Sequence, residues 1–152
     1  MSKVTTSSTA RRPEKRPFAH LRGEERIYFR AAAENRLVFQ RCVACSAMQF
    51  PPRSVCSSCL GHELTIEDAQ GQGSIYSFTV VHRPGHPAFR DCVPYVVVLV
   101  DLDEGVRVIA DLEIESGTTP RVGDRVEAFF EPHDEEYGVP RFRLILEGRS
   151  TQ

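Results

Sequence analysis

The sequence predicts a mostly β protein, in which an N-terminal helix and a four-cysteine ribbon precede a barrel of five antiparallel strands. Two observations carry this prediction. Two Cys-x-x-Cys pairs lie close together in the first half of the chain, and five segments with alternating apolar residues occupy residues 74–146. Five short antiparallel strands suit a small closed or partly open barrel such as the five-stranded OB-fold, and a small sandwich is the alternative.

The chain divides into four predicted regions. The first residues are basic and rich in Ser and Thr, and they contain almost no large apolar side chains. Such a segment cannot bury enough surface to offset the entropy lost on ordering, so we expect a disordered tail, with a basic nucleic-acid arm as the alternative. The predicted regions are the tail at 1–17, the helix at 18–36, the cysteine ribbon at 37–70 and the OB-fold domain at 71–148.

A helix is predicted from about residue 20 to residue 35. Apolar side chains recur there at helical spacing on one side, while glutamates and arginines occupy the other side. Three consecutive alanines are strong helix formers, and Asn35 is a suitable stop. Residues 37–39 then read as a short strand that enters the first cysteine pair. The apolar side of the helix comprises Leu21, Tyr28, Phe29, Ala32 and Ala33.

The second half of the chain has the two-residue periodicity of β-strands. Alternate residues are apolar in the segment 106–112, and the same pattern recurs from Phe142 to Leu146. Residues 103–105 read as a tight hairpin turn, and residues 120–124 as a turn that precedes the fourth strand. The predicted strands are 74–81, 95–102, 106–112, 125–130 and 141–146.

Four cysteines form the clearest functional pattern. The pairs Cys42-x2-Cys45 and Cys56-x2-Cys59 are separated by ten residues, and each pair can turn its two thiolates towards one point. Four thiolates complete a tetrahedral sphere that suits one structural Zn²⁺, with no position open for a water molecule. Iron in a rubredoxin-like site is an alternative. Two disulfides or four unrelated thiols are further alternatives, although a reducing compartment disfavours disulfides.

The connection between the first two barrel strands, residues 82–94, is a second candidate site, because connections of this length are often functional. His82 and His86 could form an acid–base pair. However, Pro84 and Gly85 break any helical spacing between the two histidines, so they need not face each other. A connection that contacts a partner or a ligand is therefore the simpler interpretation.

The sequence contains no recognisable catalytic constellation. It has no Gly-x-Ser-x-Gly motif, no phosphate-binding loop and no Gly-rich dinucleotide-binding turn. The fifth cysteine, Cys92, has no partner nearby in the sequence. It reads as a small buried apolar residue, with a reactive nucleophile as the alternative.

Charge is unevenly distributed along the chain. Residues 1–72 carry eleven Lys/Arg and seven Asp/Glu, a balance of +4, whereas residues 73–152 carry eight and fourteen, a balance of −6. We therefore expect an anionic ligand to bind the first half, and no nucleic acid to bind the acidic strand region. The longest apolar stretch is too short to span a membrane and no secretory signal is evident, so a cytoplasmic location is expected.

Several short motifs follow one another in a specific order. Phe50-Pro51-Pro52-Arg53 lies between the cysteine pairs, and later motifs are GQGSIYS at 71–77, PYV at 94–96, LDEG at 102–105 and VGDRV at 122–126. In this order, and with the four cysteines, the chain resembles the acyl-CoA-associated zinc-ribbon/OB-fold family, long catalogued as a domain of unknown function. The resemblance covers about residues 18–147. The first cysteine pair lacks the glycine that many family members have after it.

The resemblance implies a non-catalytic accessory subunit with a structural zinc ion. Within this family, the chain is similar to small partners of thiolases, condensing enzymes, steroid side-chain aldolases and hydratases. The resemblance therefore implies a hetero-oligomer with an enzyme of one of these classes. The implied ligand is a coenzyme A ester, which the subunit binds or shields. Arginine recognises phosphate through its forked geometry, and the basic half of the chain offers Arg22, Arg26, Arg30, Arg36, Arg41 and Arg53.

Ligand and partner contacts are expected mainly in the long connection. The candidates are His82, Arg83, His86 and Phe89, with Arg53 of the ribbon as a further contact. Two other classes of function remain open. A single-stranded nucleic-acid-binding module is the main alternative, and the acidic strand region argues against it. A stand-alone enzyme is the other alternative, which the missing catalytic constellation disfavours.

Overall fold

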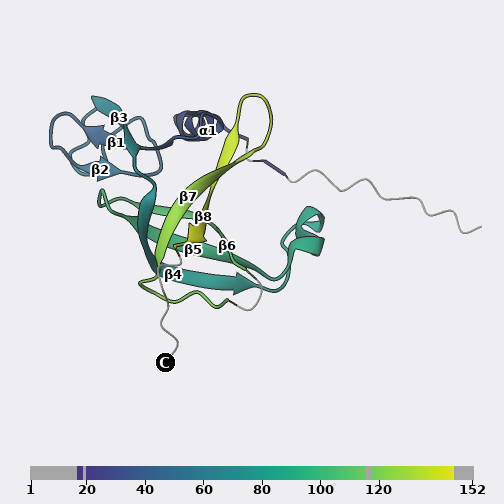
Figure 1. The fold of residues 1–152 in the computed structure, drawn as a ribbon. Helices are drawn as coiled ribbons and strands as arrows, with labels where there is room; N and C mark the ends of the chain where they lie inside the picture. Colours follow the sequence, from purple (N-terminus) through teal and green to yellow (C-terminus); the bar gives the residue numbers. More distant parts are fainter. Residues whose placement is uncertain (1–16, 19, 116–117, 146–152) are drawn as a thin grey trace, which may run out of the picture.

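The computed structural model describes residues 17–18, 20–115 and 118–145. Within these residues the predicted mostly β fold is confirmed, with one α-helix, a three-stranded sheet and a five-stranded barrel (Figure 1). The predicted disordered tail lies outside the described residues, apart from Pro17, and so does Leu146 at the end of the last predicted strand.

Helix α1 spans Glu25–Ala33 and is shorter at its N-terminal end than the sequence pattern predicts. The carboxylate of Glu25 explains the late start, because it accepts hydrogen bonds from the backbone N–H groups of Arg22 and Gly23 at 2.7 and 3.0 Å. These bonds hold the preceding residues in a turn. A negative charge in the first helical turn also interacts favourably with the helix dipole.

The predicted helix stop at Asn35 is confirmed. Asn35 has a φ of +58°, the left-handed conformation that asparagine tolerates better than most residues. Its N–H donates to the carbonyl of Ala32, and the N–H of Arg36 donates to the carbonyl of Ala31. This pair of bonds is the Schellman pattern, which satisfies the last carbonyls of a helix and turns the chain. The chain therefore enters the ribbon directly.

The ribbon contains a sheet of three antiparallel strands in the order β2-β1-β3. Strand β1 is twice the predicted length and pairs with β3 over its whole course. The sequence did not predict β3, because Leu64 and Ile66 are its only large apolar residues and the acidic pair Glu67-Asp68 follows them. The strands are β1 (Leu37–Cys42), β2 (Met48–Gln49) and β3 (Leu64–Ala69).

All five predicted barrel strands are present and close into a barrel in the order β4-β5-β6-β8-β7. Four pairings are antiparallel, and β6 pairs with β8 in parallel at Leu112–Phe142 and Glu113–Arg143. This closing contact is short, and an ion-pair network lies over it: Arg141 on β8 binds Asp111 on β6 at 2.8 Å and Glu131 on β7 at 3.0 Å. The strands are β4 (Gln72–Val81), β5 (Tyr95–Leu102), β6 (Arg107–Glu113), β7 (Arg125–Pro132) and β8 (Gly138–Leu144).

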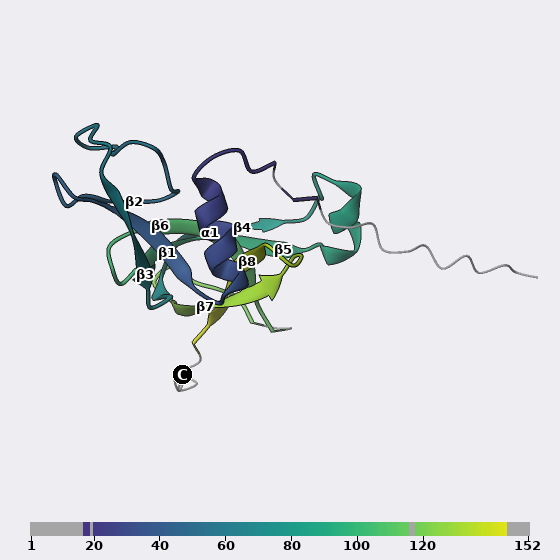
Figure 2. The same ribbon diagram turned by 90° about the horizontal axis from the view of Figure 1, so that it is seen from above.

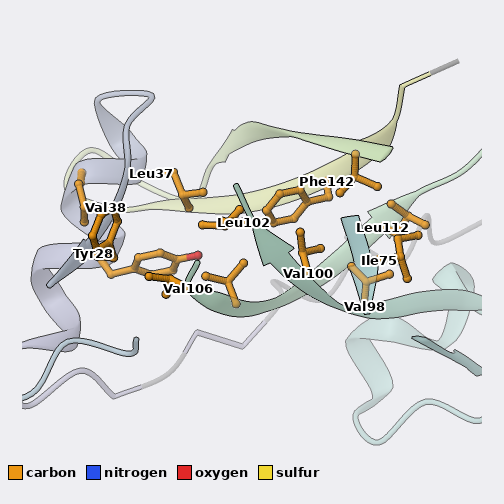
Figure 3. Close-up of a cluster of buried hydrophobic side chains, with 14 of the residues drawn as sticks. Tyr28, Leu37, Val38, Ile75, Val98, Val100, Leu102, Val106, Leu112 and Phe142 are labelled. Atoms are coloured by element: carbon orange, nitrogen blue, oxygen red, sulfur yellow. The ribbon is translucent and has the colours of Figure 1, made fainter. Parts of the chain in front are cut away.

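One hydrophobic core joins the helix, the ribbon and the barrel. Inside the barrel, Val98, Val100 and Phe142 are fully buried, as the two-residue periodicity predicts. Tyr28 of α1 and Leu37 of β1 belong to the same cluster (Figure 3). The inward-facing residues of the barrel therefore continue into the base of the ribbon.

The turn between β5 and β6 fixes the connection between ribbon and barrel. Glu104 in this turn accepts a hydrogen bond of 2.6 Å from the backbone N–H of Gln70, which links β3 to β4. Its neighbour Asp103 is held by two bonds from Arg125, at 2.7 and 2.6 Å. The predicted hairpin turn is thus confirmed, and it also binds the linker, whose Gly71 has a φ of +79°.

Helix α1 approaches the barrel most closely at Gly138, the first residue of β8. A Cβ atom at this position would lie 2.7 Å from the backbone C of Ala32 and 2.7 Å from the backbone N of Ala33. These are main-chain atoms, so they cannot move aside as a flexible side chain can. The seating of the helix on the barrel therefore requires glycine at this position.

We predict that Gly138→Ala lowers the free energy of unfolding by about 1–3 kcal/mol, the usual cost of overpacking a well-packed contact. Urea unfolding followed by circular dichroism measures the change. Gly85→Ala is the matched control, because no atom lies within 4 Å of a Cβ built there. Equal stability of the two variants would show that the helix does not depend on this close approach.

Candidate metal centre

The ribbon brings the sulfur atoms of Cys42, Cys45, Cys56 and Cys59 together, all within 4.8 Å of one another. The Sγ–Sγ distance is 3.6 Å for Cys42–Cys59 and also 3.6 Å for Cys45–Cys56. Zn–S bonds of about 2.3 Å imply sulfur–sulfur edges of about 3.8 Å in a tetrahedron, so the four sulfurs fit such an ion. Two of these cysteines are buried and two are exposed, which places the cluster at the surface of the ribbon.

Both cysteine pairs form the same backbone turn. The N–H of Ser46 donates to the carbonyl of Cys42 at 2.9 Å, and the N–H of Leu60 donates to the carbonyl of Cys56 at 3.1 Å. Ser46 and Leu60 each have a left-handed φ, of +60° and +62°. Ser46 therefore provides the backbone conformation in the first turn although no glycine is present there. A side chain at Gly61 would approach the Cys59 sulfur to 3.3 Å, so a small residue is needed beside the cluster.

Backbone N–H groups and neighbouring thiols shift the acidity of the cysteines in opposite directions. The N–H groups of Cys59 and Ser58 point at the Cys56 sulfur and lower its pKa to about 6. The N–H of Ala47 lowers the pKa of Cys45, but the surrounding thiols and burial outweigh it and raise this pKa to about 12. Four thiolates can thus coexist here only with a cation among them.

Four cysteine ligands would fill the tetrahedral sphere of a zinc ion. Such a site leaves no position for a substrate or a water molecule, so its role is to stabilise the fold. The turns hold all four ligands at the loop end of the ribbon, and β1 carries Cys42 directly into the site. Sequence reasoning missed two residues beside it, the buried glutamines Gln40 and Gln49. The signal available for them is a polar residue at a position that the strand pattern would bury: Gln40 alternates with Val38 and Cys42, and Gln49 lies between Met48 and Phe50.

The other predicted contact residues do not gather at one place. His82, Arg83, His86 and Phe89 lie on the β4–β5 connection, which carries a 3-10 helix, η1, at Pro87–Cys92. This connection and the ribbon that carries Arg53 lie at opposite ends of the molecule in both views (Figure 1, Figure 2). The structure therefore separates Arg53 from the other four.

The β4–β5 connection has an ordered local structure. The Nδ1 atom of His86 accepts a hydrogen bond of 3.1 Å from the backbone N–H of Ala88 and so caps η1. The ring centroids of Phe89 and Tyr95 are 6.0 Å apart, so an aromatic contact links the connection to the start of β5.

Half of the arginines expected to recognise phosphate are bound to carboxylates. Arg30 pairs with Glu136, Arg41 pairs with Glu67 at 2.7 Å, and Arg36 pairs with both Glu34 and Asp68. In each case the carboxylate raises the pKa of the guanidinium. These pairs are exposed and add little stability, but they neutralise charge that an anionic ligand would need.

Within the described residues, no helix is both long enough and apolar enough to cross a bilayer.

The fold and the cysteine cluster define a zinc-ribbon protein with an OB-fold domain. Two family models match it: the rubredoxin-like zinc ribbon domain of ChsH2 over residues 29–65, and the C-terminal OB-fold domain of ChsH2 over residues 67–131. A DUF35 domain-containing scaffold protein of Methanothermobacter thermautotrophicus is 33% identical over 102 residues, which cover 66% of this chain and 75% of that protein. The chain therefore belongs to the DUF35 family of ChsH2-like zinc-ribbon/OB-fold proteins.

Other relatives are parts of enzymes that act on CoA esters. The "Probable enoyl-CoA hydratase alpha subunit" of Thermomonospora curvata is 39% identical over 145 residues, and the benzoylsuccinyl-CoA thiolase subunit BbsA of Thauera aromatica is 34% identical over 110 residues. The match to BbsA covers 69% of this chain and 74% of that subunit. The match to the hydratase subunit covers 91% of this chain but only 43% of that protein, so the chain spans less than half of its length.

A solved structure has the same fold over most of the chain. The chain matches the structure of an Ltp2-ChsH2(DUF35) aldolase with a TM-score of 0.73 and 35% sequence identity, and the match covers 84% of this chain and 98% of that chain. A DUF35-family protein of unknown function from Sulfolobus solfataricus matches with a TM-score of 0.53 at 14% identity, a likeness of fold alone.

We predict that the purified protein contains one zinc ion per chain and that Cys42→Ser reduces its metal content to well under one. A serine hydroxyl is a poor substitute for a thiolate, and metal-binding free energy also stabilises the folded ribbon. Elemental analysis measures the metal, and thermal unfolding measures the accompanying loss of stability.

Cys92→Ser is the matched control, because Cys92 lies on η1, outside the cluster. It should keep a full complement of metal. Metal-free wild-type protein, or iron in place of zinc, would contradict the expectation of a zinc site.

Proposed function

We propose that this chain is a non-catalytic accessory subunit of an enzyme that processes acyl-CoA, and that Cys42, Cys45, Cys56 and Cys59 hold one structural zinc ion. The partner is a thiolase-like, aldolase or hydratase subunit, and the chain binds or shields its acyl-CoA. The observation that carries the proposal is the closed four-cysteine cluster on a fold whose relatives are named as scaffold proteins and as enzyme subunits. A cluster of this kind stabilises a surface without performing chemistry.

The β4–β5 connection is the proposed contact with the partner enzyme or with the entrance for acyl-CoA. It extends from the barrel beyond the shared core and presents His82, Arg83, His86 and Phe89. Proline-rich segments lose little entropy on docking, and aromatic and arginine side chains contribute most to protein interfaces. Arg53, at the far end, would have to contact a different part of the partner or a second ligand.

A cytoplasmic location forms part of the proposal. None of the five cysteines of the described residues forms a disulfide, which suits a reducing compartment. Thiolates that are kept reduced remain available to a metal ion.

We expect no acyl-CoA turnover by the isolated chain. We also expect a thiolase-like, aldolase or hydratase protein encoded beside it to become soluble or active only when the two are produced together. Affinity purification of the tagged chain, followed by an assay of the purified complex, measures both outcomes. A partner that folds and works equally well alone would contradict the accessory role.

Replacing His82 and His86 together with Ala should weaken the complex or raise the Michaelis constant for acyl-CoA, without abolishing the reaction. The matched control is the replacement of His20 and His62, two exposed histidines outside the β4–β5 connection. The amount of partner that co-purifies with the tagged chain measures complex formation, and steady-state kinetics of the purified complex measure the Michaelis constant. Turnover by the isolated chain that disappears on the His82/His86 replacement would identify the connection as an active site instead.

Binding of single-stranded nucleic acid is the alternative function, and the charge of the barrel argues against it. Between Gln72 and Leu144 the strands carry many carboxylates, and arginines such as Arg141 and Arg107 are already paired with them. A groove that follows a phosphate backbone needs unpaired positive charge. We therefore expect a variant without residues 1–17 to show no micromolar binding to single-stranded DNA or RNA at physiological salt, as measured by fluorescence anisotropy.

A further inference from the structure

Gln40 and Gln49 are the two buried polar side chains in the described part of the chain, with exposed fractions of 3% and 6%. They lie directly opposite each other in the register of β1 and β2. The Nε2 of Gln49 donates to the Oε1 of Gln40 at 2.9 Å, so the two amides form one unit. Burying two amides is costly unless they are hydrogen-bonded, so their partners explain why they are present.

The amide of Gln40 binds one residue of the loop that joins the two cysteine pairs. Its Oε1 accepts a hydrogen bond of 2.7 Å from the N–H of Arg53, and its Nε2 donates to the carbonyl of Arg53 at 2.9 Å. The side chain of Gln40 thus bonds both the N–H and the carbonyl of Arg53, as the backbone of a neighbouring strand would. Arg53 lies outside any strand, so this side chain takes the place of a sheet partner for the loop.

The amide of Gln49 binds the residues on either side of Cys56. Its Nε2 donates to the carbonyl of Val55 at 3.1 Å, and its Oε1 accepts from the N–H of Ser57 at 2.8 Å. Both hydrogens of this amide are used, one on Val55 and one on Gln40. The backbone before and after Cys56 is therefore bound to a single buried group.

Strand geometry connects this unit to the metal ligands. Side chains two residues apart on a strand point to the same face, so Gln40 and Cys42 lie on one face of β1. The loop that the two amides bind crosses this face and delivers Cys56 to the cluster, where its sulfur lies 3.6 Å from that of Cys45. Without the two amides, the loop would lose the side-chain hydrogen bonds that hold it against β1 and β2.

We propose that Gln40 and Gln49 are positioning residues for the metal centre, which set the place of Cys56 among the four thiolates. The inference rests on the metal site proposed above. The amides do not contact the metal; they fix the backbone that carries one ligand. Their loss removes the acceptors of the Arg53 and Ser57 N–H groups and allows Cys56 to move away from the other ligands.

The test uses Gln40→Met and Gln49→Met, which keep the length of the side chain and remove the amide. Each variant should bind zinc at least tenfold more weakly in competition with a chromophoric chelator. Gln72→Met is the matched control, because Gln72 is exposed on β4. Its zinc affinity should equal that of the wild type.

A spectroscopic readout separates positioning from a general loss of stability. Cobalt(II) in the wild-type protein should give the visible spectrum of four-thiolate tetrahedral coordination. In the two variants the bands should move to higher energy, because an oxygen ligand replaces the Cys56 sulfur. A variant that had only lost stability would keep the four-thiolate spectrum at temperatures where it is folded. Wild-type zinc affinity and an unchanged cobalt spectrum in both variants would overturn the inference.

A measurement on the unaltered protein covers the case in which the variants do not fold. In the zinc-loaded wild type, the amides of Arg53 and Ser57 should exchange their hydrogens slowly, since both donate to buried side-chain oxygens. Fast exchange at both amides would also overturn the inference. Failure of the wild type to bind any metal would instead overturn the proposed metal site itself, so the two failures are distinguishable.

Discussion

The structure depends on a single strand, β1, that is buried on both faces. Leu37, Val38 and Phe39 all have exposed fractions of 2% or less. Consecutive strand residues point in opposite directions, so a run of buried residues means that both faces of the strand are covered. Helix α1 contacts the strand, and the loop between the cysteine pairs is bound to it through Gln40. The ribbon therefore shares the core of the barrel and does not have to fold alone.

This arrangement places two candidate sites far apart on one packed molecule. The ribbon that carries the cysteine cluster lies at one end, and the β4–β5 connection with η1 lies at the other (Figure 2). Ribbon, helix and barrel are joined by the shared core, by the hydrogen bond from Gln70 to Glu104, and by the close approach of α1 at Gly138. A protein that binds other subunits at separate places benefits from such stiffness, because little orientational freedom remains to be lost on assembly.

The sequence predicted the elements that have a local pattern, either alternating apolar residues or paired cysteines. It did not predict the elements and contacts that depend on residues far apart in the chain. The five barrel strands alternate apolar and polar residues because one face meets the core and the other meets water. Strand β3 escaped prediction because it has only two large apolar residues and is defined by its pairing with β1. The closing pair β6–β8 and the ion pair from Arg141 to Asp111 could not be foreseen, since they join residues 30 positions apart in the chain.

The same limits apply to the candidate site. Spacing alone identified the four cysteines, because local turns determine how each pair converges. Gln40 and Gln49 gave no such signal, since their importance comes from Arg53 and Ser57, which the loop brings back to them. The separation of Arg53 from His82 likewise follows from the topology, which sequence order does not reveal.

The short link between β3 and β4 has a consequence for how the family can vary. Gln70 and Gly71 alone join the two strands; the first is bound by Glu104, and the second needs a left-handed backbone. An insertion there would break the bond and turn β4 out of register, so the spacing between ribbon and barrel should be inherited unchanged. The β4–β5 connection has no such restriction, because lengthening a surface loop costs little entropy. If the proposed function holds, adaptation to new partner enzymes would proceed by changing that connection, while the half with the four cysteines stays constant.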